Sequence, residues 1–205
     1  MDASGSIEDE FDEEKVAAAQ IASTIGISGG SNGNRIGLGT FSTGSTIEFY
    51  CDGHTNLTTM IPDILDTSAQ LSRTNIRAGL LRGEEILTTN GCGQRNMNVT
   101  SRVIIIFTDG ENNQPNNANS DQRLIDEATR LRMVENITII AIGIGDDIDQ
   151  QQLMDISDRM ILVSTDDLDA GIMVQQIINN TICGKFLFSI SVTQSNLASS
   201  TLDIL

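Results

Sequence analysis

Two short apolar runs constrain the fold of this chain more than any other feature. Val103–Phe107 and Ile137–Ile142 are dominated by isoleucine and other apolar residues. Each run has the length of a buried strand and falls far short of the roughly 18 residues that a membrane-spanning helix needs. A strand that is apolar on both faces is typical of a parallel sheet covered by helices on both sides. Asp121–Val134, between the two runs, has the pattern of a helix, so the sequence predicts a strand–helix–strand unit.

Predicted helices and strands alternate along the rest of the chain. The short polar connection Ser42–Gly44 predicts that the first two strands form an antiparallel hairpin. We therefore expect an α/β fold, with a doubly wound, mostly parallel sheet, one antiparallel edge strand and helices on both faces. The predicted helices are Glu8–Thr24, Asn56–Asp66, Asn75–Leu87, Asp121–Val134, Asp149–Ile156 and Leu168–Ile182, and the predicted strands are Arg35–Phe41, Thr46–Cys51, Arg102–Thr108, Ile137–Ile142 and Met160–Val163.

The first central strand of such a sheet is missing from the start of the sequence. The sheet needs a strand directly before the polar loop at Asp2, yet the sequence begins at Met1. The tail ends in Thr201–Leu205, and Leu202–Leu205 followed by Met1–Ser4 would form a continuous strand and loop. Two explanations stay open: a fragment of a tandem array whose next repeat begins near Leu202, which we favour, or a circular permutant whose tail fills the central position. We expect one domain over 1–183 and, over 184–205, a linker, the start of a next repeat or a permuted strand.

The charge of the chain limits its partners. A formal net charge of −16 repels phosphate backbones, so we expect no nucleic-acid partner, and no apolar run is long enough to span a membrane. The single histidine, His54, lies in a polar loop, and we expect a solvated residue there, not a metal ligand.

Cysteines and glycosylation sequons leave the cellular compartment open. Without a CxxC motif, Cys51, Cys92 and Cys183 fit either one disulfide plus one thiol or three thiols. Sequons of the form N-x-S/T are weak evidence for secretion because the chain is rich in Asn, Ser and Thr. The candidate glycosylation sites are Asn56, Asn98, Asn136 and Asn179.

Three separate polar segments predict a metal site. Asp2–Ser6 reads Asp-Ala-Ser-Gly-Ser, Thr74 precedes a predicted helix, and Asp109 follows the strand that ends at Thr108. Loops at the carboxyl ends of parallel strands converge on one crevice, where these carboxylate and hydroxyl oxygens would suit Mg²⁺ or Mn²⁺. Each segment alone could equally be a helix cap or a turn, and their joint placement carries the prediction.

These segments resemble the von Willebrand factor A (integrin I-like) domain family, which has a metal-ion-dependent adhesion site. Asp2–Ser6 matches its D-x-S-x-S signature, and Phe11 and Lys15 fall where the family often has these residue types. Ile104–Gly110 resembles the fourth strand and TDG turn of the family. Ala141–Gly145 and Leu168–Cys183 resemble its fifth strand and last helix, so the resemblance covers residues 1–183 apart from the first strand.

The resemblance implies a site and a way of using it. A protein partner would complete the shell of a bound Mg²⁺ or Mn²⁺ with an acidic side chain. The family usually has Thr-x-(Thr/Gly)-x-Ala-Leu around its threonine, whereas Thr74 here begins the run Thr-Asn-Ile-Arg-Ala-Gly-Leu. The implied metal residues are Asp2, Ser4, Ser6, Thr74 and Asp109.

The resemblance also implies features away from the metal. Leu168–Ile182 would be the element that moves when coordination changes, although the same helix could simply be packed in place. The family fold would bring Cys51 and Cys92 to the face opposite the metal, so that a Cys51–Cys92 disulfide competes with the interpretation that all cysteines are reduced.

Three functions compete. The first is a divalent-cation-dependent adhesion or protein-ligand-binding module, extracellular or at the cell surface. The second is a cytoplasmic domain of this family that serves as an assembly subunit of a larger complex. The third function, an enzyme, has the least support. The sequence has no P-loop, no Ser/His/Asp set and only a fragment of a dinucleotide fingerprint at Gly143–Gly145. We therefore expect a binding domain and not an enzyme.

Overall fold

The computed structural model describes residues 1–5, 10–28, 33–89, 92, 100–113, 119–145 and 148–163. Within them, the helices are α1 (Phe11–Ile25), α2 (Leu57–Leu65), α3 (Ile76–Thr88), α4 (Ser120–Met133) and α5 (Gln150–Ile156). The strands are β1 (Leu38–Phe41), β2 (Ser45–Phe49), β3 (Arg102–Phe107), β4 (Ile137–Ile144) and β5 (Arg159–Val163). Several predictions fall outside the described residues: Ser6, Asn98, Asn179, Cys183, the helix Leu168–Ile182 and the tail 184–205.

The strands form a parallel sheet and an antiparallel pair, as predicted. β3, β4 and β5 pair in parallel in that order, and β1 and β2 form the antiparallel hairpin. The apolar runs Val103–Phe107 and Ile137–Ile142 therefore lie next to each other, with Ile105 opposite Ile140. The doubly wound α/β prediction is confirmed.

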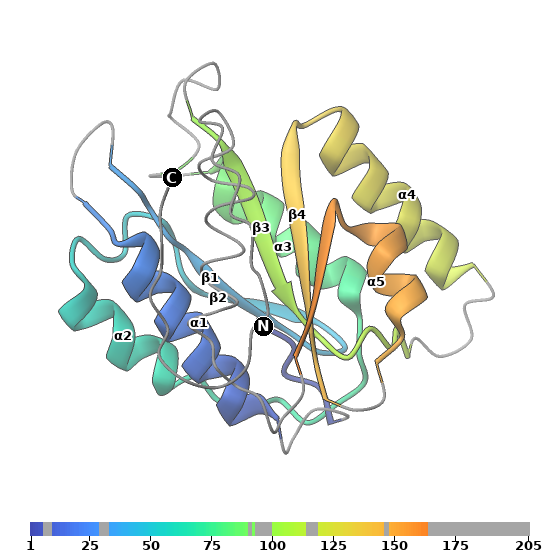
Figure 1. The fold of residues 1–205 in the computed structure, drawn as a ribbon, viewed down its shortest axis with the longest axis horizontal. Helices are drawn as coiled ribbons and strands as arrows, with labels where there is room; N and C mark the ends of the chain where they lie inside the picture. The colour runs from blue at the N-terminus through green and yellow to red at the C-terminus, as the bar shows by residue number, and fades with distance from the viewer. Residues whose placement is uncertain are drawn as a thin grey trace, which may run out of the picture.

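The first residues of the chain connect the two groups of strands. The Asp2 amide donates to the Phe107 carbonyl at 3.1 Å, and the Ala3 amide donates to the Phe41 carbonyl at 2.7 Å. On the same side, the Phe41 amide donates to the Met1 carbonyl at 3.1 Å. Met1–Ala3 thus lies between β1 and β3, in line with the central strand position, and the N-terminus lies at this point in Figure 1.

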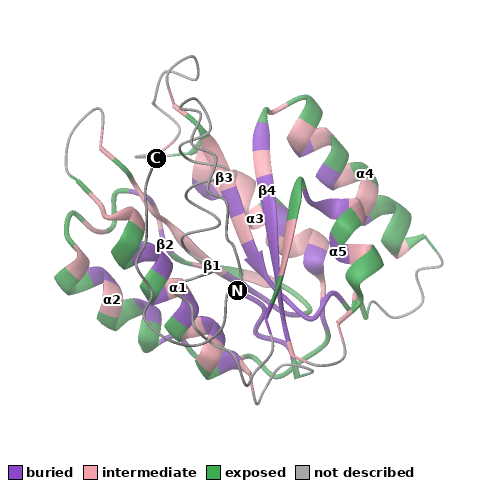
Figure 2. Cartoon of the chain, viewed as in Figure 1, coloured by how far each residue is buried: buried purple, intermediate pink, exposed green. Residues whose placement is uncertain are grey.

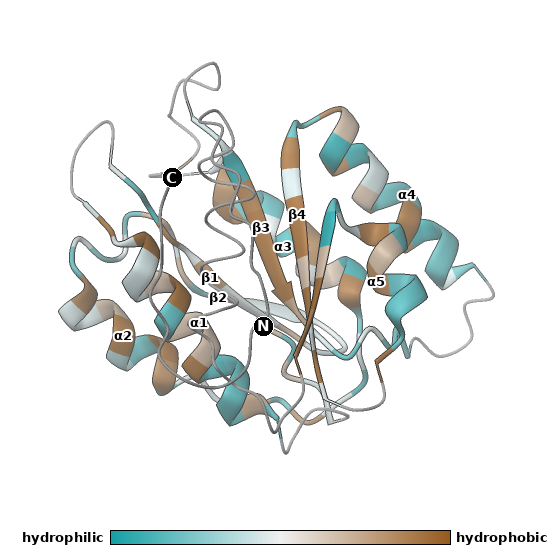
Figure 3. Ribbon diagram, in the orientation of Figure 1, coloured by the Kyte–Doolittle hydropathy of each residue, from teal (hydrophilic) through white to brown (hydrophobic). Residues whose placement is uncertain are grey.

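Helices cover both faces of the strands (Figure 1). α1 and α2 lie on one side and α3, α4 and α5 on the other. Apolar side chains from β3 and β4 fill the layers between, where Figure 3 shows both strands as largely hydrophobic and Figure 2 shows mainly buried residues. One core cluster joins Met1, Ala3 and Phe11 to the sheet, and another packs Leu80 and Leu124 on the opposite face.

Several predicted strand boundaries are wrong by one to three residues, most clearly those of β4 and β1. β4 runs on to Ile144, where a loop was expected from Gly143, because Gly143 and Ile144 still pair with Leu162 and Val163 of β5. β1 begins at Leu38, later than the expected Arg35, and its register to β2 shifts between Leu38 and Gly39.

The expectation of a solvated His54 is also wrong. Its side chain is only 9% exposed, its ring meets Phe49 edge-on with centroids 4.6 Å apart, and Nε2 lies 3.2 Å from Asp63 Oδ2. Phe49 is the last residue of β2, and the turn closed by the bond from the Gly53 amide to the Tyr50 carbonyl brings His54 back against it.

Cys51 and Cys92 are joined by a disulfide, with their Cα atoms 5.5 Å apart. The bond ties the segment after β2 to the segment after α3. Among the residues described, no helix has both the length and the apolar character needed to cross a membrane.

Candidate metal centre

The candidate site lies where the chain leaves the Met1–Ala3 segment and β3. Asp2 lies within that segment and Ser4 follows it, Asp109 comes after the end of β3, and Thr74 precedes α3. All four residues are buried, with Asp2, Ser4 and Thr74 at most 1% exposed and Asp109 8% exposed. The structure therefore brings the three predicted segments together; Ser6, the fifth predicted ligand, lies outside the described residues.

Two hydrogen bonds orient the Asp2 carboxylate. The Ser4 amide donates to Oδ1 at 3.0 Å, and the Thr108 hydroxyl donates to Oδ2 at 2.7 Å. The Gly110 amide donates in turn to the Thr108 hydroxyl at 3.2 Å. Thr108 was predicted only as a strand residue; its place next to Asp109 in the threonine–aspartate–glycine turn was the signal for this second role.

Thr74 reaches the site through its side chain. Its hydroxyl donates to Ser4 Oγ at 2.9 Å, which links two segments that are 70 positions apart. The N-cap of α3 is Asn75, whose side chain accepts from the Ala78 amide, so Thr74 is not the helix cap. The hydroxyl pair of Ser4 and Thr74 is the kind of oxygen cluster that a hard cation can use.

The turn after β3 holds Asp109 in place. The Glu111 amide donates to Asp109 Oδ1 at 2.9 Å, and the Asp149 amide donates to the Asp109 carbonyl at 2.9 Å. Gly110 has a φ of +86°, and a Cβ at this position would lie 2.8 Å from the Asp149 carbonyl oxygen. Glycine is therefore required here for both conformation and space.

A second loop fixes the Thr74 segment against the Asp2 segment. The amides of Gln70 and Leu71 both donate to the Ala3 carbonyl at 2.9 Å, and the Gly5 amide donates to the Ser72 carbonyl at 2.7 Å. Leu71 has a φ of +49°, a region that leucine rarely adopts, and the residue is 51% exposed. No sequence pattern predicted this loop as part of the site.

Burial and mutual repulsion raise the pKa values of the carboxylates at this site. Burial raises the pKa of Asp2 to about 6, and the nearby Asp109 charge adds to the rise, while hydrogen bonds from Thr108 and Ser4 oppose it. Burial also raises the pKa of Glu14, on α1, well above its usual value, with Asp2 and Asp109 contributing in the same direction. Carboxylates that disfavour one another's ionisation would be relieved by a positive ion between them.

The donor set fits a hard divalent ion. The described part of the site supplies the carboxylates of Asp2 and Asp109 and the hydroxyls of Ser4 and Thr74, which are all oxygen donors. Nowhere in the described ranges do three or more His, Cys, Asp or Glu side chains gather as a metal cluster. Four protein oxygens would leave coordination positions of an octahedral ion for water or for an oxygen from a partner.

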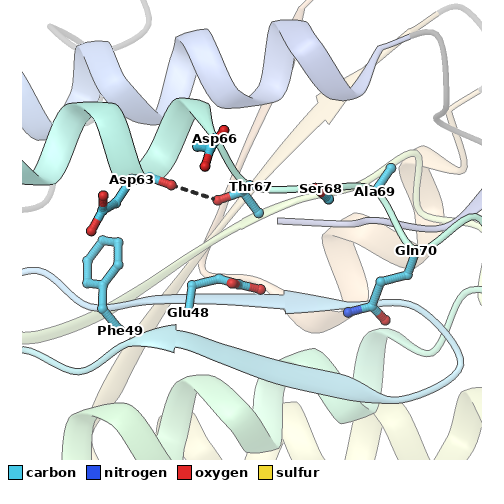
Figure 4. A pocket seen from close by; sticks show the side chains of 8 residues that line it. All are labelled: Glu48, Phe49, Asp63, Asp66, Thr67, Ser68, Ala69 and Gln70. Carbon is cyan, nitrogen blue, oxygen red and sulfur yellow. Dashed lines mark hydrogen bonds between the residues drawn. The ribbon is translucent and has the colours of Figure 1, made fainter.

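A pocket of about 460 Å³ lies elsewhere, between β2 and the segment after α2 (Figure 4). Its lining includes the carboxylates of Glu48, Asp63 and Asp66, all on exposed residues. It shares none of the metal-site residues, and its acidic, solvated lining lacks the apolar walls typical of small-molecule sites.

Comparisons with solved structures show the same fold. Proximal thread matrix protein 1 from the mussel byssus superposes with TM-scores of 0.71 in one crystal form and 0.72 in a structure described as having a "zinc occupied MIDAS motif". Each aligns with 22% identity over 87% of this chain and 45% of the mussel chain, so this chain spans less than half of that protein. A von Willebrand factor type A protein from Catenulispora acidiphila gives a TM-score of 0.60, with 17% identity over 88% of this chain and 40% of the other.

Sequence comparison identifies the family. No curated protein matches the chain. The model of the von Willebrand factor type A domain matches residues 1–177, which include every described element and all five predicted metal residues. The chain therefore belongs to the von Willebrand factor type A domain family, whose members are protein-interaction modules.

Proposed function

We propose that this domain binds a divalent cation and uses it to hold an acidic group of a protein partner. The observation that carries the proposal is the convergence of two buried carboxylates, Asp2 and Asp109, on the hydrogen-bonded hydroxyls of Ser4 and Thr74. Two carboxylates buried near each other repel, and a cation would offset that repulsion. The domain acts as a binding module and not as an enzyme.

Each residue has a separate role in the proposal. Ser4, Thr74 and Ser6 offer hydroxyl oxygens, and Asp2 and Asp109 offer negative charge. Thr108 positions Asp2 through its 2.7 Å hydrogen bond. The cation would offer an open coordination position to a partner's carboxylate, because hard divalent ions usually keep water ligands that an incoming oxygen can replace.

Mg²⁺ or Mn²⁺ is the proposed ion. Carboxylate and hydroxyl oxygens are hard ligands that suit these ions, whereas zinc favours nitrogen and sulfur donors. The zinc-occupied motif named for the mussel protein supports metal binding by a relative of the same fold and makes zinc the competing ion to test.

Isothermal titration calorimetry with MgCl₂, MnCl₂ and ZnCl₂ tests the site directly. We expect wild-type protein to bind Mg²⁺ or Mn²⁺ and the Asp109→Asn variant to lose at least tenfold in affinity. Asp126→Asn is the matched control, since Asp126 lies exposed on α4 and bonds only with Gln122 among the contacts described. Equal affinity in wild-type and Asp109→Asn protein would refute the site.

We propose an extracellular or cell-surface location. The Cys51–Cys92 disulfide supports it, because such bonds persist in oxidising compartments. Asn56 and Asn136 are exposed, so both sequons are accessible, although the Asn56 side chain caps α2 by accepting from the Thr59 amide. Mass spectrometry of protein from a eukaryotic secretory host tests this: glycans at Asn136 would support it, and unmodified protein with free Cys51 and Cys92 would favour the cytoplasmic assembly role.

A further inference from the structure

The buried face of α1 carries a carboxylate at a position where an apolar side chain would be expected. Phe11, Glu14, Ala18 and Ile21 lie three or four positions apart along α1 and therefore share one face of the helix. Phe11 and Ile21 belong to the core cluster on this side of the sheet, and Ala18 packs against it. Glu14 lies in this apolar row and is fully buried. Because a buried ionisable group is costly unless it is paired, Glu14 requires a compensating partner.

The described residues do not provide that partner. Both carboxylate oxygens of Glu14 are buried without a hydrogen-bond partner in the described part of the chain, and none of the ion pairs found there includes Glu14. Lys15, the next residue of α1, pairs instead with Asp12 at 2.7 Å. The buried oxygens of Glu14 therefore have the capacity to accept hydrogen bonds from a bound group.

The electrostatic surroundings of Glu14 place it beside the candidate metal centre. Burial is the largest cause of its raised pKa; the Met1 amino group and the Asp2 amide oppose the rise, and the charges of Asp2 and Asp109 add to it. The Asp2 amide gives its own hydrogen bond to the Phe107 carbonyl at 3.1 Å. Glu14 thus lies next to Asp2 and within electrostatic reach of Asp109, the two carboxylates assigned to the cation.

Glu14 is not a direct ligand together with Asp2 and Asp109. Among the described residues, no three acidic side chains lie close enough to hold one metal ion. A carboxylate behind the ligands can still act on the ion, because groups that hydrogen-bond to metal ligands orient them and tune the affinity of the site. A hard divalent ion usually keeps water ligands, and each of these waters is a hydrogen-bond donor. The ion also favours the ionised form of a nearby carboxylate.

We propose that Glu14 is a positioning residue of the metal centre, whose carboxylate accepts a hydrogen bond from a water ligand of the cation held by Asp2 and Asp109. The inference rests on the proposed function. It gives the buried oxygens of Glu14 the donor that they lack among the described residues. It also explains why a carboxylate occupies the apolar row of α1. Partners of this kind typically change metal affinity by roughly 10- to 100-fold when they are removed.

Calorimetric titration with MgCl₂ and MnCl₂ tests the role of Glu14. Glu14→Leu removes the acceptor and suits the apolar row, and we expect it to bind at least tenfold more weakly than wild-type protein. Glu14→Gln keeps one acceptor oxygen but not the charge, and should lose less. Asp12→Asn is the matched control: it removes one negative charge from the same turn of α1, but the Asp12 side chain is 86% exposed, so the affinity should stay unchanged.

Thermal unfolding in EDTA separates this role from a structural one. Glu14→Leu should raise the melting temperature of the metal-free protein, because it replaces a buried carboxylate without a described partner by an apolar side chain. If Glu14 only stabilised the fold, for example by attracting the Met1 amino group, Glu14→Leu would instead lower the melting temperature and leave the affinity for Mg²⁺ unchanged.

The outcomes distinguish this inference from the proposed function. Wild-type protein that binds Mg²⁺ or Mn²⁺, with Glu14→Leu binding equally tightly, would overturn the role of Glu14 and leave the proposed function standing. Wild-type protein that binds neither ion would overturn both. Weaker binding by Glu14→Leu, together with unchanged binding by Asp12→Asn, would support the inference.

Discussion

The Thr108 hydroxyl donates a 2.7 Å hydrogen bond to Asp2 Oδ2, between two residues 106 positions apart that are both fully buried. This bond ties the β3 turn to the Met1–Ala3 segment and presents the carboxylate to the candidate metal site. It also lowers the cost of burying the Asp2 charge, since hydrogen bonds favour the ionised form.

Thr108→Val should therefore weaken both the fold and metal binding. Valine keeps the shape but removes the donor, and losing a hydrogen bond to a buried charge costs about 1.5–3 kcal/mol. Chemical denaturation measures the loss, and calorimetry measures the reduced affinity for Mg²⁺. Thr67→Val is the matched control: the Thr67 hydroxyl donates to the uncharged Asp63 carbonyl at 3.1 Å, so its loss should cost about 0.5–1.5 kcal/mol and leave Mg²⁺ affinity unchanged. Identical behaviour of the two variants would contradict the proposed role of Thr108.

The metal-free domain should become less stable as the pH rises from about 4 to 7. The pKa of Asp2 is raised from 3.8 to about 6 in the folded state, so between these values the folded chain binds more protons than the unfolded chain. Stability is then highest at low pH and falls as Asp2 ionises, by on the order of 3 kcal/mol at about 1.4 kcal/mol per pKa unit. Glu14 acts in the same direction because burial raises its pKa as well.

A divalent cation should oppose this trend, since it binds the ionised carboxylate. Thermal unfolding in EDTA and in excess MgCl₂ across this pH range measures both effects. The stabilisation by Mg²⁺ should grow with pH. A stabilisation that is the same at pH 4 and pH 7 would argue against Asp2 as part of the site.

The disulfide prediction is tested by removing both of its cysteines. The Cys51–Cys92 bond closes a loop between positions 41 apart, for which chain-entropy arguments give about 4 kcal/mol of stabilisation. Cys51→Ser/Cys92→Ser should lose a large part of that energy in chemical denaturation, and so should wild-type protein in reducing agent. Cys183→Ser is the control, and a loss of stability there equal to that of the double variant would indicate a different pairing.

The sequence predicted those parts of the structure that depend on local pattern. β3 and β4 were identifiable because a strand buried on both faces is apolar at nearly every position. The candidate ligand Asp109 was identifiable because it follows such a strand, and Asp2 because it begins the D-x-S-x-S motif. The roles of Thr108 and of the Leu71 loop could not be predicted in this way, because they arise from contacts between distant segments. The burial of His54 was missed for a different reason: its partner Phe49 is only five residues away, but the polar composition of the turn between them suggested an exposed loop.

The backbone conformation of Leu71, in the loop that binds the Ala3 carbonyl, is expected to lower the stability of the fold. Its φ of +49° places a Cβ-bearing residue in the left-handed region, which costs leucine roughly 1–2 kcal/mol, while its half-exposed side chain recovers little by burial. Leu71→Gly should therefore leave stability unchanged or raise it by up to about 1 kcal/mol, because relief of the strain exceeds the entropy that glycine loses on folding. Leu81→Gly, at a comparably exposed leucine inside α3, should instead destabilise the domain by about 1 kcal/mol. Denaturation curves of the two variants measure the contrast, and an equal loss in both would show that the backbone at Leu71 is not strained.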